Sequence, residues 1–244
     1  MARPASPILA IDAATALCSV AVWDAAADDA RGRLCGSLER QGPTGEAALL
    51  PRMVADLLAG HGLAPAGLTA IAVNIGPGSF TGLRASIALA QGLALGRGLP
   101  VIAVTIAEAL HAALAADDAA GLVWCALDAR QGRLFLHAGG APEEWSVAQI
   151  AAPPRPDRPV TLTGDAAAAL GVALGEVGAT VTVSEARQSH ATFVAQAAAL
   201  RLAGHLPPLP AAPLYIDPPR ALLPRGGLRP PPQGWSPQTW SPQT

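Results

Sequence analysis

Hydrophobic positions along the first hundred residues alternate between strand-like and helix-like spacing. The first apolar run breaks at Asp12-Ala13-Ala14-Thr15, a sequence typical of a hairpin turn. Helical spacing over residues 46–60 and again up to Gly98 predicts two helices, and the element order becomes β-β-β-α-β-α-β-α. This order predicts a sheet with parallel members and helical crossovers. The strand-like runs are residues 8–24, 34–39, 68–74 and 101–104.

The second half of the chain repeats the start of the first. In both halves an apolar strand ends in Asp-Ala, at Asp12-Ala13 and Asp128-Ala129, and a second strand follows a short turn. Such internal similarity predicts a duplicated α/β fold of two lobes, each with a mixed sheet flanked by helices. The lobes are expected at residues 1–106 and 107–206, followed by a proline-rich tail at 207–244. Further elements are expected as a hairpin at 122–139, strands at 160–163 and 180–183, and helices at 166–174 and 191–202.

The stretch NIGPGSFTGLR, residues 74–84, lies between a strand and a helix, where nucleotide-binding proteins hold phosphate. Its glycine spacing is one residue longer than the dinucleotide fingerprint, and no lysine follows it. We therefore expect a structural loop, in which glycines admit neighbouring backbone and a hydroxyl caps the helix. The residues of this structural loop are Gly76, Pro77, Gly78, Ser79, Thr81 and Gly82, with Ser79 or Thr81 as the cap.

Composition excludes several classes of chemistry. All 16 basic residues are arginines, so the chain offers no P-loop lysine, Schiff-base lysine or lysine general base. The three cysteines form no C-x-x-C pair, and the five histidines never fall at i and i+4, so we predict no metal site and a cytoplasmic location. A net charge of −2 without a basic stripe does not favour tight RNA binding by this chain alone. Apolar runs are too short to span a membrane.

Asp12, Thr15 and Asp128 carry the enzymatic hypothesis. They occupy turns where a sugar-kinase-like protein meets phosphate and magnesium, which makes a small-molecule phosphotransferase the alternative function. The methyl groups of Ala13 and Ala14 would crowd a phosphate there. The competing interpretation is that these carboxylates only form turns.

Two helices of the first half are more apolar than a single buried stripe requires. Leucines recur through residues 46–60, and the helix after the glycine loop is apolar nearly all round. Burying one leucine is worth about 1.5–3 kcal/mol, so we expect a partner subunit to cover them. The alternative is that the helices cover each other and the second lobe.

The segments ILAIDAAT, CSVAVW, GPGSFTGLR, QGLALG, ALDARQG and PLY together resemble the TsaB (YeaZ) family of bacterial tRNA threonylcarbamoyladenosine biosynthesis subunits. The resemblance runs from about residue 7 to 217. It implies an actin-like, sugar-kinase-like (ribonuclease H-like) fold and a non-catalytic subunit that scaffolds and activates a TsaD-type transferase acting on adenosine 37 of tRNA. A glycopeptidase label attached to some relatives is a third hypothesis, which the missing metal ligands oppose.

The resemblance also implies partners and cofactors. The partners are a TsaD-type catalytic subunit and a TsaE-type ATPase, with a homodimer through the same surface and tRNA reached only through the complex. No cofactor is expected on this chain alone, while the wider pathway uses ATP, threonine and bicarbonate. Relatives place a histidine where Gly45 stands here. Carried over to this sequence, the partner interface comprises Leu49, Leu50, Met53, Leu57, Arg84, Ile87 and Gln91.

The chain from Pro207 onward is rich in proline and ends in the tandem repeat WSPQTWSPQT. Proline interrupts backbone ladders, so we predict little regular structure there. The stretch LYID at residues 214–217 is expected to pack as the last ordered segment.

Overall fold

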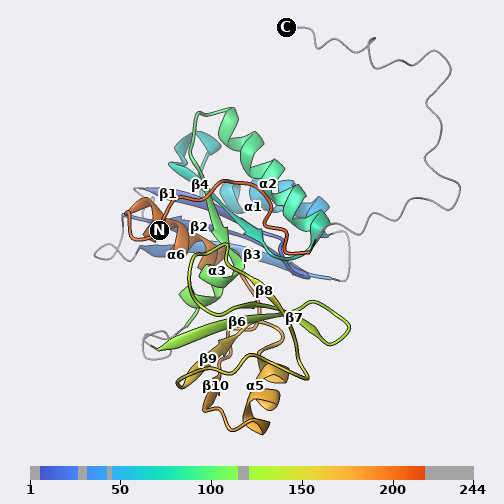
Figure 1. Cartoon of the computed structure of the whole chain (residues 1–244). Coiled ribbons are helices and arrows are strands. Elements are labelled where there is room, and N and C mark those ends of the chain that lie inside the picture. Colours follow the sequence, from blue (N-terminus) through green and yellow to red (C-terminus); the bar gives the residue numbers. More distant parts are fainter. Residues whose placement is uncertain (1–5, 27–31, 43–45, 115–120, 218–244) are drawn as a thin grey trace, which may run out of the picture.

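The computed structural model describes residues 6–26, 32–42, 46–114 and 121–217. The described residues form two lobes, each built on a five-stranded sheet, and the lobes lie one above the other in Figure 1. Gly45 and the WSPQT repeat lie outside the described residues, as does all of the tail from residue 218.

The first sheet has the strand order β3-β2-β1-β4-β5. β1 pairs antiparallel with β2 and parallel with β4, so the sheet is mixed, as predicted. Side chains of β1, β2 and β4 are buried along their whole length because helices cover both faces, which explains their nearly continuous apolar runs. The strands are β1 (Pro7–Asp12), β2 (Leu17–Asp24), β3 (Arg33–Gln41), β4 (Ala70–Gly76) and β5 (Val101–Thr105).

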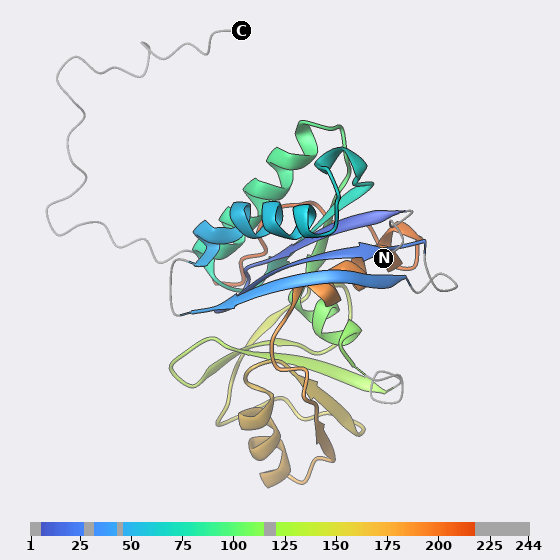
Figure 2. The ribbon, with the colours of Figure 1, turned by 180° about the vertical axis from the view of Figure 1, so that it is seen from behind.

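Helices from distant parts of the chain cover the two faces of this sheet. Figure 2 shows α1 and α2 above the strands, and α3 and α6 below them. The first pair buries leucines, whereas α6 presents small side chains, such as Ala195 and Ala198, to Ala10 and Ala72 of the strands. The elements are η1 (Glu46–Leu49), α1 (Leu50–Gly60), η2 (Pro65–Gly67), α2 (Phe80–Leu95), α3 (Ile106–Ala112) and α6 (Ala191–Leu202).

The position of α6 corrects the predicted lobe boundaries. Residues 107–206 are expected to form the second lobe, but α6 packs on β1 and β2 of the first sheet and on α3. The reason is that α3 has only seven residues, too few to cover this face of the sheet, so a second helix must return to it. The first lobe therefore contains α3 and α6 as well as the elements from β1 to β5.

The second sheet has the order β10-β9-β6-β7-β8, which matches the first sheet with β6 in the place of β1. This confirms the predicted duplication and fold class. Residues 150–159, which join β8 to β9, form no counterpart of α1 because they include four prolines, at positions 153, 154, 156 and 159. The elements are β6 (Leu122–Asp128), β7 (Arg133–His137), β8 (Ser146–Gln149), β9 (Val160–Thr163), α5 (Ala167–Glu176) and β10 (Val181–Val183). The short strand β8 was not predicted.

After α6 the chain crosses the outer side of the first lobe without regular secondary structure. We call residues 207–217 the strap. Leu209, Ala211 and Leu214 pack against the core under α1 and α2, and the Leu214 N–H donates to the carbonyl of Ile75 (2.8 Å). The expectation that residues 214–217 pack is confirmed for Leu214 and Tyr215, and the residues after Asp217 lie outside the described ranges.

Candidate functional site

A cavity of about 920 Å³ lies between the lobes. Its walls come from the β1–β2 turn and the start of α2 on the first lobe, and from the β6–β7 turn on the second. Of the three candidate nucleotide residues, Thr15 and Asp128 line this cavity, but Asp12 does not.

Asp12 is completely buried beneath the turn. Its Oδ1 accepts from the Ala14 N–H (2.9 Å), and its Oδ2 accepts from Asn74 Nδ2 (3.1 Å) and from the Ser189 hydroxyl. Burial raises the pKa of this carboxyl above 3.8, although the hydrogen bonds act in the opposite direction. The arrangement ties the end of β1 to β4 and to the residues before α6. Asp12 is therefore engaged in hydrogen bonds within the fold and lies behind the residues that line the cavity.

The glycine loop packs directly on the β1–β2 turn. A Cβ atom built on Gly78 would lie 2.1 Å from the carbonyl oxygen of Ala14, and one built on Gly82 would lie 2.0 Å from that of Ala13. The Ser79 N–H donates to the same Ala14 oxygen (2.7 Å). Backbone from the loop thus packs against both carbonyls of the turn, and the two segments together line one wall of the cavity.

Loop geometry agrees with the predicted structural role. Gly76 has φ +102°, a conformation that favours glycine, and Pro77 is buried behind it. Ser79 caps α2 by accepting from the Gly82 N–H (3.2 Å), so the cap is Ser79 and not the exposed Thr81.

The other two nucleotide candidates have local partners. Thr15 Oγ1 accepts from the Leu17 N–H (3.2 Å), and Asp128 Oδ1 accepts from the Arg130 N–H (2.7 Å). The Asp128 N–H donates to Asp165 Oδ1 (2.9 Å), and Asp165 also lines the cavity. Burial raises the pKa of Asp165, with the nearby Asp128 charge adding to the shift. Sequence reasoning missed Asp165, because only the fold brings the turn after β9 beside the β6–β7 turn. The predicted phosphotransferase set is not assembled, since Asp12 is buried while Asp128 faces the cavity.

Of the seven residues predicted for the partner interface, the structure buries four and exposes three. Leu50, Met53, Leu57 and Ile87 are buried in the core between the helices and the first sheet. The expectation that they form an uncovered apolar face is therefore wrong for these four residues, because they supply the contact of α1 and α2 with the strands. The remaining three predicted residues, Leu49, Arg84 and Gln91, are exposed.

Exposed positions on both helices form an outer face opposite the sheet. Leu95 at the end of α2 is 86% exposed, and Leu49 before α1 is 46% exposed. The positions between them on the two helices carry mainly small or polar side chains. We call this set the helical face: Leu49, Arg52, Ala55, Ala59, Arg84, Ala88, Gln91 and Leu95.

The strap borders the helical face along α2. Gln91 Nε2 donates to the Ala211 carbonyl (2.9 Å), and Arg84 Nε donates to the Tyr215 hydroxyl (2.9 Å). The Tyr215 ring stacks on Phe80 at a centroid distance of 5.6 Å, and the Arg84 guanidinium lies 3.8 Å from the Phe80 centroid. The chain itself therefore covers part of α2, through the strap and not through the second lobe.

Comparison with known proteins identifies the family of the chain. Residues 47–196 match the model of the TsaD family, described as tRNA N6-adenosine threonylcarbamoyltransferase. The tRNA threonylcarbamoyladenosine biosynthesis protein TsaB of Escherichia coli strain K12 is 41% identical over 128 residues, a segment that covers 52% of each chain. The chain thus covers about half the length of this curated relative.

Solved structures resemble a larger part of the chain. Two structures from Pseudomonas aeruginosa, one described as similar to peptidase YEAZ and the other as YeaZ, are each 26% identical. The first has a TM-score of 0.66 and covers 87% of this chain and 100% of that one; the second has a TM-score of 0.62, with coverage of 86% and 100%. Every helix within the described ranges is too short or too polar to cross a bilayer.

Proposed function

The chain belongs to the TsaD family, and on that basis we propose that it is the accessory, TsaB-type subunit of tRNA threonylcarbamoyladenosine synthesis. In this role it scaffolds and activates a separate TsaD-type transferase and does not itself catalyse transfer. The similarity to the E. coli protein supports the pathway, and the geometry of the β1–β2 turn supports the accessory role.

The packing of the β1–β2 turn against the glycine loop is the observation that best supports an accessory role. The carbonyls of Ala13 and Ala14 meet the backbone at Gly82 and Gly78, so the glycine loop serves to hold the turn against α2. Asp12, the carboxylate best placed in sequence to hold a metal–phosphate group, has both oxygens occupied by internal donors. We expect no nucleotide bound by this chain alone.

The helical face is the surface that we assign to the TsaD-type subunit. Leu95 exposes most of its side chain to water, and covering it is worth about 1.5–3 kcal/mol. Ala55, Ala59 and Ala88 allow a facing helix to approach closely, while Arg84 supplies the kind of side chain that is enriched at interface centres. Because this chain and a TsaD-type subunit share a family, like surfaces can pair about a pseudo-twofold axis. The same face would serve a homodimer, with a TsaE-type ATPase and tRNA joining through the complex.

Co-purification with the TsaD-type subunit of the same cells, with mass measurement in solution, tests the pairing. Leu95→Asp places a charge on the helical face and is expected to weaken the complex at least tenfold, about 1.4 kcal/mol. The matched control is Val172→Asp on α5, since Val172 is also an exposed apolar residue of a helix but lies on the second lobe. Equal binding of both variants would contradict the assignment of this face.

The accessory role has its own test. The purified chain should leave tRNA unmodified, and modification should appear only after the TsaD-type subunit and the ATPase are added. Calorimetry with Mg-ATP should give no binding heat with the isolated chain. Micromolar binding that Asp128→Asn abolishes would instead support the phosphotransferase alternative.

A further inference from the structure

The strap connects the two lobes through contacts that the proposed function does not require. Its start belongs to the first lobe, because the Arg201 guanidinium on α6 donates to the Pro207 carbonyl and also pairs with Glu108 of α3. Its middle lies along α2 and donates from Leu214 to the Ile75 carbonyl. The strap is thus fixed on the first lobe over most of its length.

The Phe80–Tyr215 stack holds the strap beside the cavity. Phe80 lines the cavity at the start of α2, and Arg84 binds both rings of the pair. An arginine engaged by an aromatic ring and by a hydroxyl loses much of its freedom to rotate. These contacts direct the next residues of the strap towards the second lobe.

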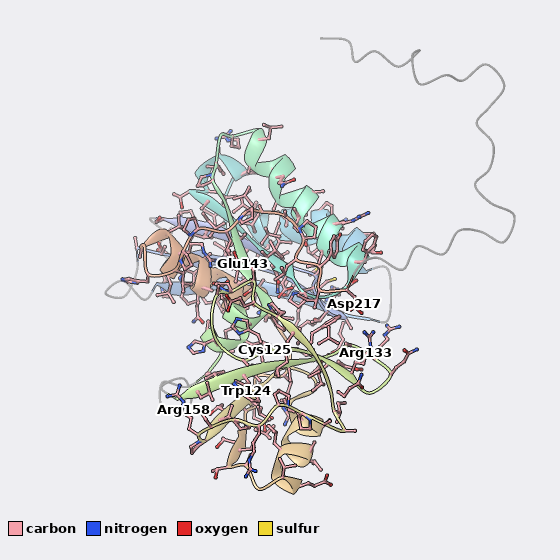
Figure 3. The ribbon with its side chains drawn as sticks, in the orientation of Figure 1. Trp124, Cys125, Arg133, Glu143, Arg158 and Asp217 are labelled. Carbon is pink, nitrogen blue, oxygen red and sulfur yellow. The ribbon has the colours of Figure 1, made fainter. Side chains whose placement is uncertain are left out.

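The strap ends on the second lobe. Asp217 Oδ2 accepts from Arg133 on β7 (3.0 Å), and Figure 3 shows Asp217 between α2 and Arg133. The other terminal nitrogen of Arg133 donates to the Ala129 carbonyl (3.3 Å), in the turn that forms the opposite wall of the cavity. The side chains of Arg133 and Asp217 are only 21% and 30% exposed, so solvent and salt screen this pair less than a fully exposed one.

We propose that the strap is an internal tether that fixes the separation of the two lobes. Closure of two lobes around a ligand is a common motion in proteins. Here the Arg133–Asp217 pair joins the two lobes from within the chain. The lobes also share one hydrophobic cluster, in which Cys125 and Leu127 of β6 lie with Ile106 of α3. Breaking the ion pair removes the additional contact that the strap makes, so the separation of the lobes varies more, while the strap stays attached to α2 through Tyr215 and to β4 through Leu214. The inference concerns the conformation of the isolated chain and holds whether or not a TsaD-type partner binds.

Electron-spin distance measurement on the full chain tests the tether. Spin labels are placed at Ala59→Cys on α1 and Ala168→Cys on α5, both exposed, whereas Cys18, Cys35 and Cys125 are buried and react poorly. Asp217→Asn and Arg133→Gln each remove the ion pair with little change in side-chain size. The expected result is a broader distance distribution shifted to longer distance in both variants, and a return to the wild-type distribution in Asp217→Glu.

Asp56→Asn is the control, because Arg52 and Asp56 form an ion pair within α1, 2.9 Å apart, that joins no lobes. The circular dichroism spectrum and urea midpoint of each variant are measured first, to show that it is folded. Asp217 lies in the strap and Arg133 on β7, so either variant alone can test the tether if the other does not fold. Wild-type distributions in folded Asp217→Asn or Arg133→Gln would overturn the proposal. Equal broadening in Asp56→Asn would also overturn it.

Discussion

Replacing Gly82 with alanine tests the packing of the glycine loop on the β1–β2 turn. The new methyl group would lie 2.0 Å from the Ala13 carbonyl oxygen, which belongs to the main chain and cannot move as a side chain does. Either α2 or the turn must shift. The shift would also strain the hydrogen bond from the Ser79 N–H to the Ala14 carbonyl.

The expected change in the unfolding free energy of Gly82→Ala is the sum of one stabilising and two destabilising terms. Alanine in a helix gains about 0.8–1 kcal/mol over glycine. Overpacking costs about 1–3 kcal/mol, and losing one hydrogen bond costs about 0.5–1.5 kcal/mol. The net expectation is a loss of about 0.5–3.5 kcal/mol in unfolding free energy.

Gly92→Ala is the matched control in the same helix. Gly92 is exposed and has no atom within 4 Å of a built Cβ, so the variant should gain about 0.5–1 kcal/mol. Urea unfolding followed by tryptophan fluorescence gives both free energies and their slopes. If Gly82→Ala were as stable as the wild type while Gly92→Ala gained as expected, the close contact with the turn would be refuted.

Three other predictions concern buried polar contacts. Burial raises the Asp12 pKa, so its contribution to stability is complete below the unfolded value of 3.8 and is lost as pH rises through the folded value. Asp12→Asn should therefore flatten the fall in unfolding free energy as pH rises above 3.8. An unchanged slope would contradict this. Ser79→Ala should lose about 0.5–2 kcal/mol with its cap, while Thr81→Ala stays within about 0.5 kcal/mol, and equal losses in urea unfolding would argue against the assigned cap. Arg201→Met leaves Glu108 without its ion partner and should cost about 3–5 kcal/mol in the same assay; adding Glu108→Gln should recover part of the loss, and no recovery would contradict the pairing.

The fold could be predicted from sequence because its signals are local and repeated. The Asp-Ala turns at residues 12 and 128 mark equivalent hairpins, and the alternation of strands and helices specifies a mixed sheet. The packing of α6 could not be predicted in this way. Its alanine-rich pattern is compatible with either sheet, and the choice depends on how much of the first sheet α3 leaves uncovered.

The candidate sites were predictable only in part. The loop's structural role follows from its glycine spacing and the absence of lysine, and the structure supplies its cause in the carbonyls of Ala13 and Ala14. Helical periodicity correctly identified Leu50 and Ile87 as apolar-face residues, but periodicity does not distinguish a face that meets a sheet from one that meets a partner. The role of Tyr215 depends on contacts with residues more than a hundred positions earlier, for which the local sequence carries no signal.

The return of α6 to the first sheet also affects how the protein is made. During synthesis β1, β2 and β4 emerge early, yet the face that holds Ile8 and Ala10 stays without its α6 cover until residues 191–202 leave the ribosome. Through that interval a nascent first lobe exposes one side of its sheet, which favours aggregation and chaperone binding. A chain released before residue 191 should therefore be degraded and should not accumulate as a folded half.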